Sequence, residues 1–129
     1  MEQMKIRISI LWVMVMCGLA IHSLADLLPL FWNETVAVSD SGTAPAGLLT
    51  FMMTVTFLIP VCGILCAMYG NKRSLGIANA ILATLMFLFN LFHISELFTG
   101  FCVVQLPLLP VILAVSGILC AQSWKFMRK

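Results

Sequence analysis

The pentapeptide GILCA stands at residues 63–67 of this chain and again at residues 117–121. Each copy lies near the end of a long apolar run, a few residues before basic side chains. A looser pair accompanies it, because IHSLADL at 21–27 and FHISELF at 92–98 each carry a His, a Ser and then an acid. Together the two pairs predict a two-helix hairpin duplicated in tandem, with residues 33–47 as an insertion in the first copy.

The composition of the chain is that of a membrane protein. Hydrophobic residues make up 62% of the 129 residues and charged residues 9%, whereas soluble domains are roughly 45–50% apolar and about 25% charged. The net charge of +2 gives no reason to expect nucleic acid as a partner. The expected surroundings of the chain are the lipid bilayer.

Four apolar runs are each near the ~20 residues that cross a bilayer core. The runs occupy residues 8–32, 48–69, 75–98 and 106–124. We expect an all-α, up-and-down bundle of four transmembrane helices, forming a single membrane domain over residues 1–129. The predicted connections are two outer loops at 33–47 and 99–105 and one cytoplasmic turn at 70–74.

The basic residues indicate the orientation of these spans. All seven Lys and Arg lie before the first run, between the second and third, or after the fourth. Because Lys and Arg collect on the cytoplasmic side, we expect both termini there, in a bacterial inner membrane. The alternative is a secretory signal that is cut after Ser23 and Ala25. The apolar run continues to Trp32, which favours a membrane span over a signal core of ~7–15 residues.

The GILCA repeat also predicts helix packing. Gly63 and Ala67, and likewise Gly117 and Ala121, are small residues four apart on one helix face, where two backbones can approach closely in lipid. We expect the second and fourth helices to cross there, and a pair of hairpins that both start inside would form a parallel repeat. The alternative is that five residues agree by chance, since Gly and Ala are common in membrane helices.

Few ionisable side chains interrupt the runs. His22 and Asp26 lie in the first, and His93 and Glu96 in the third, with Asn90 one turn before His93. At ~1.5 Å per residue both groups fall in the outer half of the bilayer, and spacings of three and four put neighbours on overlapping faces. If the first and third helices meet, two imidazoles and two carboxylates converge in one pocket that is open outward.

Several chemistries suit such a pocket. His22, Asp26, His93 and Glu96 are suitable ligands for Zn²⁺ or a similar divalent ion. Heme held between the two histidines is a second possibility. A carboxylate–His pair is also a proton relay. The alternative without a ligand is that these polar groups only hold helices together.

Further polar side chains could complete the pocket. Thr50 and Thr54 lie four apart in the outer half of the second run, and Gln105 stands at the head of the fourth. We therefore predict Asp26, Asn90, Glu96, Thr50 and Thr54 as ligand-binding or proton-relay residues.

Three functions remain open at this level. The first is a small membrane protein that binds a metal ion or small ligand in the His/carboxylate pocket. The second is a proton-coupled transporter that works as an oligomer of itself, and the third is a structural or immunity-type partner of another membrane protein. Size and topology resemble many small bacterial membrane proteins, including multidrug transporters and immunity proteins. The sequence shows no diagnostic motif of either group, and with no catalytic motif we do not expect an enzyme.

Overall fold

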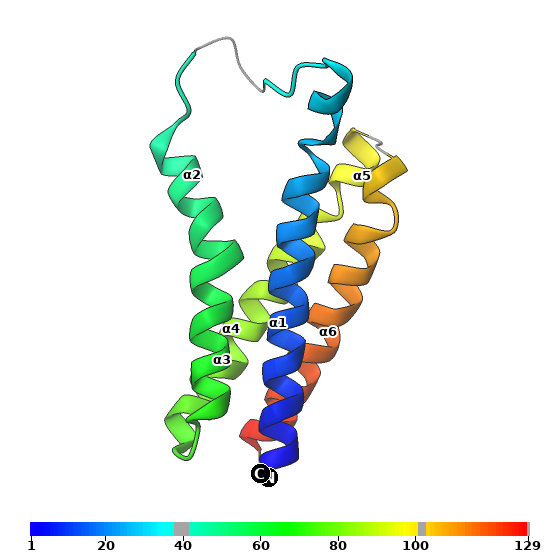
Figure 1. The fold of residues 1–129 in the computed structure, drawn as a ribbon. Helices are drawn as coiled ribbons and strands as arrows, with labels where there is room; N and C mark the ends of the chain where they lie inside the picture. Colours follow the sequence, from blue (N-terminus) through cyan, green and yellow to red (C-terminus); the bar gives the residue numbers. More distant parts are fainter. Residues whose placement is uncertain (38–41, 101–102, 129) are drawn as a thin grey trace.

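The computed structural model describes residues 1–37, 42–100 and 103–128, and all regular structure within these ranges is helical. Four helical rods run along one another, and both ends of the chain lie at the same end of the bundle (Figure 1). Each rod is long and apolar enough to cross a membrane. The predicted all-helical fold with four candidate spans is confirmed. The middle of each predicted outer loop lies outside the described residues.

The first rod, Glu2–Trp32, consists of α1 (Glu2–Ala25) and a short 3-10 helix, η1 (Leu28–Trp32). The α-helix ends shortly before Pro29, because proline lacks an N–H and disfavours helical backbone at the residue before it. Asn33 then adopts a left-handed backbone conformation, with a φ of 59°, as residues that end helices often do.

The second rod, Ala46–Met68, contains α2 (Ala46–Met53), the π-helical segment η2 (Thr54–Leu58) and α3 (Ile59–Met68). Pro60 accounts for the π-helical turn, because it has no N–H to donate to the carbonyl four residues earlier. Above this turn α2 leans away from α1, whereas α3 packs against α1 (Figure 1).

The third rod is α4 (Arg73–His93) followed by α5 (Glu96–Thr99), and the fourth is η3 (Val103–Gln105) followed by α6 (Leu108–Met127). Pro110 stands in the first turn of α6, where backbone N–H groups have no partner within the helix. A proline is therefore tolerated there without breaking the rod.

The packing order places α1, α3, α4 and α6 at the corners of a square. α1 and α4 each pack against both α3 and α6, so α3 and α6 lie at diagonal corners. The expectation that the second and fourth helices cross at the GILCA repeat is therefore wrong for the described residues. The glycine of each copy faces a helix at a neighbouring corner and not the diagonal one.

The first GILCA copy packs against α1. A Cβ atom on Gly63 would lie 2.2 Å from Cε2 of Trp12, so the indole can occupy this place only because glycine has no side chain. Ala67, one turn further, is also fully buried. This copy forms the close contact of α3 with α1.

The second copy has looser surroundings. A Cβ atom on Gly117 would meet Cε2 of Phe87 in α4 at 3.4 Å, and Ala121 is exposed. In each half of the chain the glycine therefore contacts an aromatic side chain from the first helix of its own hairpin. The contact at Gly63 is much closer than the contact at Gly117.

A buried hydrogen-bonded group crosses the centre of the square. Nε1 of Trp12 in α1 donates to Oδ1 of Asn79 in α4 at 2.8 Å, and Nδ2 of Asn79 donates to Oγ of Ser123 in α6 at 3.0 Å. All three residues are fully buried. Since Trp12 also rests on Gly63 of α3, this group connects all four rods at one level.

The unequal glycine contacts predict unequal costs of adding a methyl group. Gly63→Ala forces an atom into the indole of Trp12, and we expect it to lower the free energy of unfolding by about 1–3 kcal/mol or more. Gly117→Ala requires only a small movement of Phe87, and we expect a change within about 0.5 kcal/mol. Denaturation of both variants in detergent, followed by circular dichroism, measures the difference. Equal losses would contradict the packing described for Gly63.

Candidate metal centre

Two histidines meet across the diagonal of the bundle. His22 lies in the last turn of α1 and is buried, and His93 is the last residue of α4. Their Nε2 atoms are 2.8 Å apart, and the two rings stand nearly perpendicular, with centroids 4.7 Å apart. The structure thus brings together two of the four residues that the sequence suggests as metal ligands.

Carboxylates from both helices surround this pair. Oε1 of Glu96 lies 3.3 Å from Nδ1 of His93, and Oε2 of Glu96 lies 3.9 Å from Nε2 of His22. Oδ2 of Asp26 lies 3.8 Å from Nε2 of His22. His22, His93 and Glu96 each offer a ligand atom within 4.8 Å of the others, which suits a shared metal ion. Asp26 lies beside this group of three.

Gln105 connects Asp26 with His22. Its side chain is buried where η3 approaches α1. The Gln105 amide nitrogen donates to Oδ1 of Asp26, and its oxygen contacts Nδ1 of His22 at 2.5 Å. Sequence reasoning ranked Gln105 below the threonines, because a single Gln in an apolar segment carries no spacing pattern.

These contacts assign the protons of the cluster. Since the amide nitrogen of Gln105 faces the Asp26 carboxylate, its oxygen must accept, and Nδ1 of His22 must carry the proton. The short contact between the Nε2 atoms of His22 and His93 then needs one shared proton. Nδ1 of His93 lies 3.3 Å from Oε1 of Glu96 and forms an ion pair with it when the imidazole is protonated. A chain of polar contacts therefore runs from Asp26 through both imidazoles to Glu96.

The cluster opens into a cavity of about 300 Å³. The cavity lies on the side where α2 leans away from α1, and its apolar wall consists of Leu19, Leu48, Phe51, Met52, Val55 and Phe89. The Phe89 ring stacks on His93 at a centroid distance of 5.3 Å. A ligand in this cavity would meet polar side chains on one side and an apolar surface on the other.

The two predicted threonines lie away from the cavity. The hydroxyl of Thr50 donates to the Ala46 carbonyl, and that of Thr54 donates to the Thr50 carbonyl. Thr56, within the π-helical segment, lines the cavity instead. Met52, four residues before Thr56, also lines the cavity, so the lining face keeps the i, i+4 spacing and the predicted pair lies on another face of the rod.

Asn90 is buried one turn before His93, and it does not line the cavity. Among the described residues, neither its amide nitrogen nor its amide oxygen has a hydrogen-bond partner. A buried amide without a partner is costly. Replacing Asn90 by an apolar residue therefore tests whether its amide lowers the stability of the fold or binds a ligand.

No protein-family model, curated protein or solved structure matches this chain.

Two buried asparagines of α4 form a matched pair for mutation. Asn79→Leu leaves Trp12 and Ser123 without partners, and we expect it to lower the free energy of unfolding by about 1–3 kcal/mol. Asn90→Leu removes an amide that has no partner, and we expect it to be neutral or to raise that free energy by about 1 kcal/mol. Denaturation in detergent measures both. A loss for Asn90→Leu as large as that for Asn79→Leu would show that the Asn90 amide bonds a water molecule or ligand.

Proposed function

We propose that this chain is an integral membrane protein that binds a divalent metal ion in the outer half of the bilayer. Large apolar side chains on all four rods point outward, among them Ile10, Phe57, Leu85 and Ile118. An apolar surface that surrounds the molecule is costly in water and is stabilised in lipid. This surface supports membrane insertion.

The charge distribution supports an orientation with both termini cytoplasmic. The described Lys and Arg lie at the end of the bundle that holds the termini and the turn from α3 to α4, and Asp26, Glu34 and Glu96 lie at the other end (Figure 1). Positive side chains favour the cytoplasmic face, which in a bacterium is the inner face of the inner membrane. Gly63 and Gly117 each face an aromatic side chain of the preceding long helix, Trp12 and Phe87 respectively, which favours the tandem repeat.

The observation that carries the metal site is the 2.8 Å separation of the Nε2 atoms of His22 and His93. Two nitrogens bound to tetrahedral Zn²⁺ at ~2.0–2.1 Å lie about 3.3 Å from one another. A movement of about 0.5 Å would thus let a metal ion replace the shared proton. Oε2 of Glu96 supplies the third ligand atom. The fourth position faces the cavity, as in zinc sites that keep one position for water or substrate.

The surroundings of His22 resemble the outer shell of known metal sites. A metal-bound histidine usually donates its second ring N–H to a fixed acceptor, which orients the ring. Gln105 is such an acceptor for Nδ1 of His22, and Asp26 in turn accepts from Gln105. Nε2 of His22 is thereby left to bind a metal.

The donor set favours Zn²⁺ and similar late transition metals over other ions. Imidazole nitrogens suit these metals, whereas Mg²⁺ and Ca²⁺ prefer oxygen ligands. Heme fits less well, since its macrocycle would have to enter between His22 and His93, whose rings already touch. The chain of contacts also favours binding over proton transport, because Asp26 and Glu96 both lie at the same end of the bundle and the chain does not connect its two ends.

We expect the purified protein to bind about one Zn²⁺ per chain, and His22→Ala or His93→Ala to remove this binding while the fold is retained. Gln105→Ala should weaken binding by about 10–100-fold, as is usual for an outer-shell partner. Titration with zinc chloride in detergent measures these affinities. Magnesium chloride serves as the control salt.

Ser23→Ala is the control variant, because Ser23 lines the cavity but bonds only to the Leu19 carbonyl. Its zinc affinity should equal that of the parent protein. Unchanged zinc stoichiometry in the His22→Ala/His93→Ala double variant would refute the proposal. In that case a purely structural cluster, or binding of a partner protein, becomes the better explanation.

Zinc binding should release protons increasingly as the pH is lowered toward about 5.5, because zinc displaces protons from the imidazole nitrogens of His22 and His93. The zinc affinity should therefore fall as the pH is lowered from about 7.5 to 5.5, since protons and metal compete for the same lone pairs. Calorimetric titration in buffers of different ionisation enthalpy counts the released protons. An affinity that is independent of pH would argue against imidazole ligands.

A further inference from the structure

A second polar cavity lies at the opposite end of the bundle from the metal centre. It has a volume of about 560 Å³ and lies between the start of α4 and the end of α6. Three cationic side chains line it: Lys72 and Arg73 at the start of α4, and Arg128 after α6. We refer to these three residues and the space between them as the basic pocket.

Close packing brings the two parts of the basic pocket together. A Cβ atom on Gly76 would lie 3.8 Å from Cα of Met127, so the last turn of α6 lies directly against the first turn of α4. Nζ of the buried Lys5 donates to Oδ1 of Asn71 at 2.6 Å, which fixes the turn before α4 to the base of α1. Asn71 also lines the pocket, and this bond leaves its amide N–H groups as donors.

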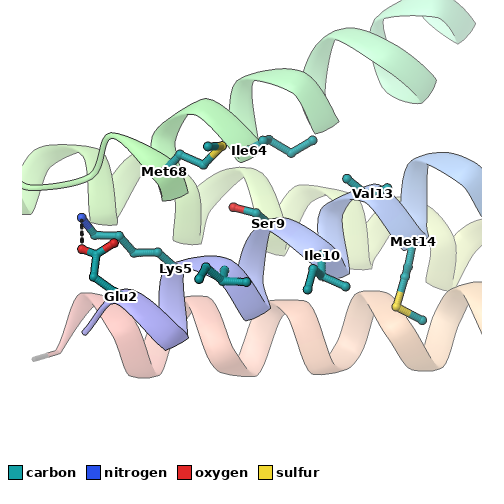
Figure 2. Close-up of a pocket in the computed structure, with 9 residues that line it drawn as sticks. Glu2, Lys5, Ser9, Ile10, Val13, Met14, Ile64 and Met68 are labelled. Carbon is teal, nitrogen blue, oxygen red and sulfur yellow. Dashed lines mark ion pairs between the residues drawn. The ribbon is translucent and has the colours of Figure 1, made fainter.

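No acidic side chain in the described ranges of the chain lines the basic pocket. Glu2, the acid at this end of the bundle, forms an ion pair with Lys5 at 3.3 Å beside an apolar groove between α1 and α3 (Figure 2). Among the described residues, the ion pairs at 4.0 Å or less involve Lys5 and the two histidines, and none involves the three cations of the pocket. Their positive charges therefore converge without an anion from the described part of the chain.

Apolar side chains also line the pocket. Phe126, which is buried, and Met127 are among its lining residues. A pocket lined by cations and apolar side chains suits a charged group that is attached to a hydrocarbon part. The same cations suit a free phosphate, because the guanidinium of arginine matches phosphate oxygens in geometry and charge.

We propose that the basic pocket binds a phosphate group, as carried by the headgroup of an anionic phospholipid. Basic pockets between membrane helices on the cytoplasmic side are suited to such headgroups. Lys72, Arg73 and Arg128 supply the charge, and Asn71 supplies further donors. This site lies at the other end of the molecule from the metal centre, and its existence does not depend on metal binding.

The test uses the full chain purified in dodecyl maltoside and titrated with dioleoylphosphatidylglycerol, with bound lipid counted by native mass spectrometry. Dioleoylphosphatidylcholine, which has the same acyl chains and no net charge, is the comparison lipid. We expect one tightly retained phosphatidylglycerol per chain and weaker retention of phosphatidylcholine. Equal retention of the two lipids would overturn the proposal.

Two double variants distinguish lipid binding in the basic pocket from a general attraction between the cationic end of the protein and an anionic lipid. Arg73→Gln/Arg128→Gln should weaken phosphatidylglycerol binding by about 100-fold, since each arginine offers a charged hydrogen bond. Arg7→Gln/Lys125→Gln removes the same charge from exposed residues outside the pocket. We expect less than about a 5-fold loss for this control pair. Equal losses in the two pairs would overturn the basic pocket as a site.

Sodium phosphate distinguishes the two sources of the phosphate group. If millimolar phosphate displaces the lipid and binds alone with the same dependence on Arg73 and Arg128, the natural ligand is a soluble phosphate compound. If phosphate does not compete, the ligand is the lipid. Both double variants should still bind zinc, so loss of lipid binding with normal zinc binding, or the reverse, shows which of the two proposals fails.

Discussion

The buried polar contacts between α1 and α4 are the constraint on which the rest of this bundle depends. These helices stand at diagonal corners, and long side chains connect them at two levels, through Trp12 with Asn79 and through His22 with His93. Ten residues of α1 separate the levels, which corresponds to about 15 Å. In apolar surroundings each of these polar groups needs a partner. The two levels therefore fix both the distance between α1 and α4 and their vertical alignment.

The second rod packs unevenly along its length against α1, which stands at one corner of this diagonal. At the inner level, Trp12 lies flat on Gly63, so α3 packs tightly against α1. Above the π-helical turn caused by Pro60, α2 leans away from α1 (Figure 1). The cavity beside the two histidines is the result. The same proline that interrupts the second rod thus gives the polar cluster its access to the surroundings.

The two ends of the bundle have opposite chemistry. The candidate metal centre has two carboxylates beside its imidazoles, whereas the basic pocket holds three cations, and Glu2 at that end is paired with Lys5. The concentration of Lys and Arg at one end is the pattern that the positive-inside rule describes for membrane proteins. It also means that a metal cation and a phosphate anion would bind at opposite faces, and neither ligand would disturb the other site directly.

The sequence by itself determined the four candidate spans, because run length and hydropathy suffice for this, and it selected His22, Asp26, His93 and Glu96, because ionisable groups are rare in such runs. It could not determine which helices are neighbours. That order depends on how Trp12 fits the space at Gly63, a shape match between residues far apart in the chain, and it places α3 and α6 at diagonal corners. The tertiary structure likewise decided the placement of Gln105, since the short 3-10 turn η3 brings its amide between Asp26 and His22, and it decided which face of the second rod lines the cavity.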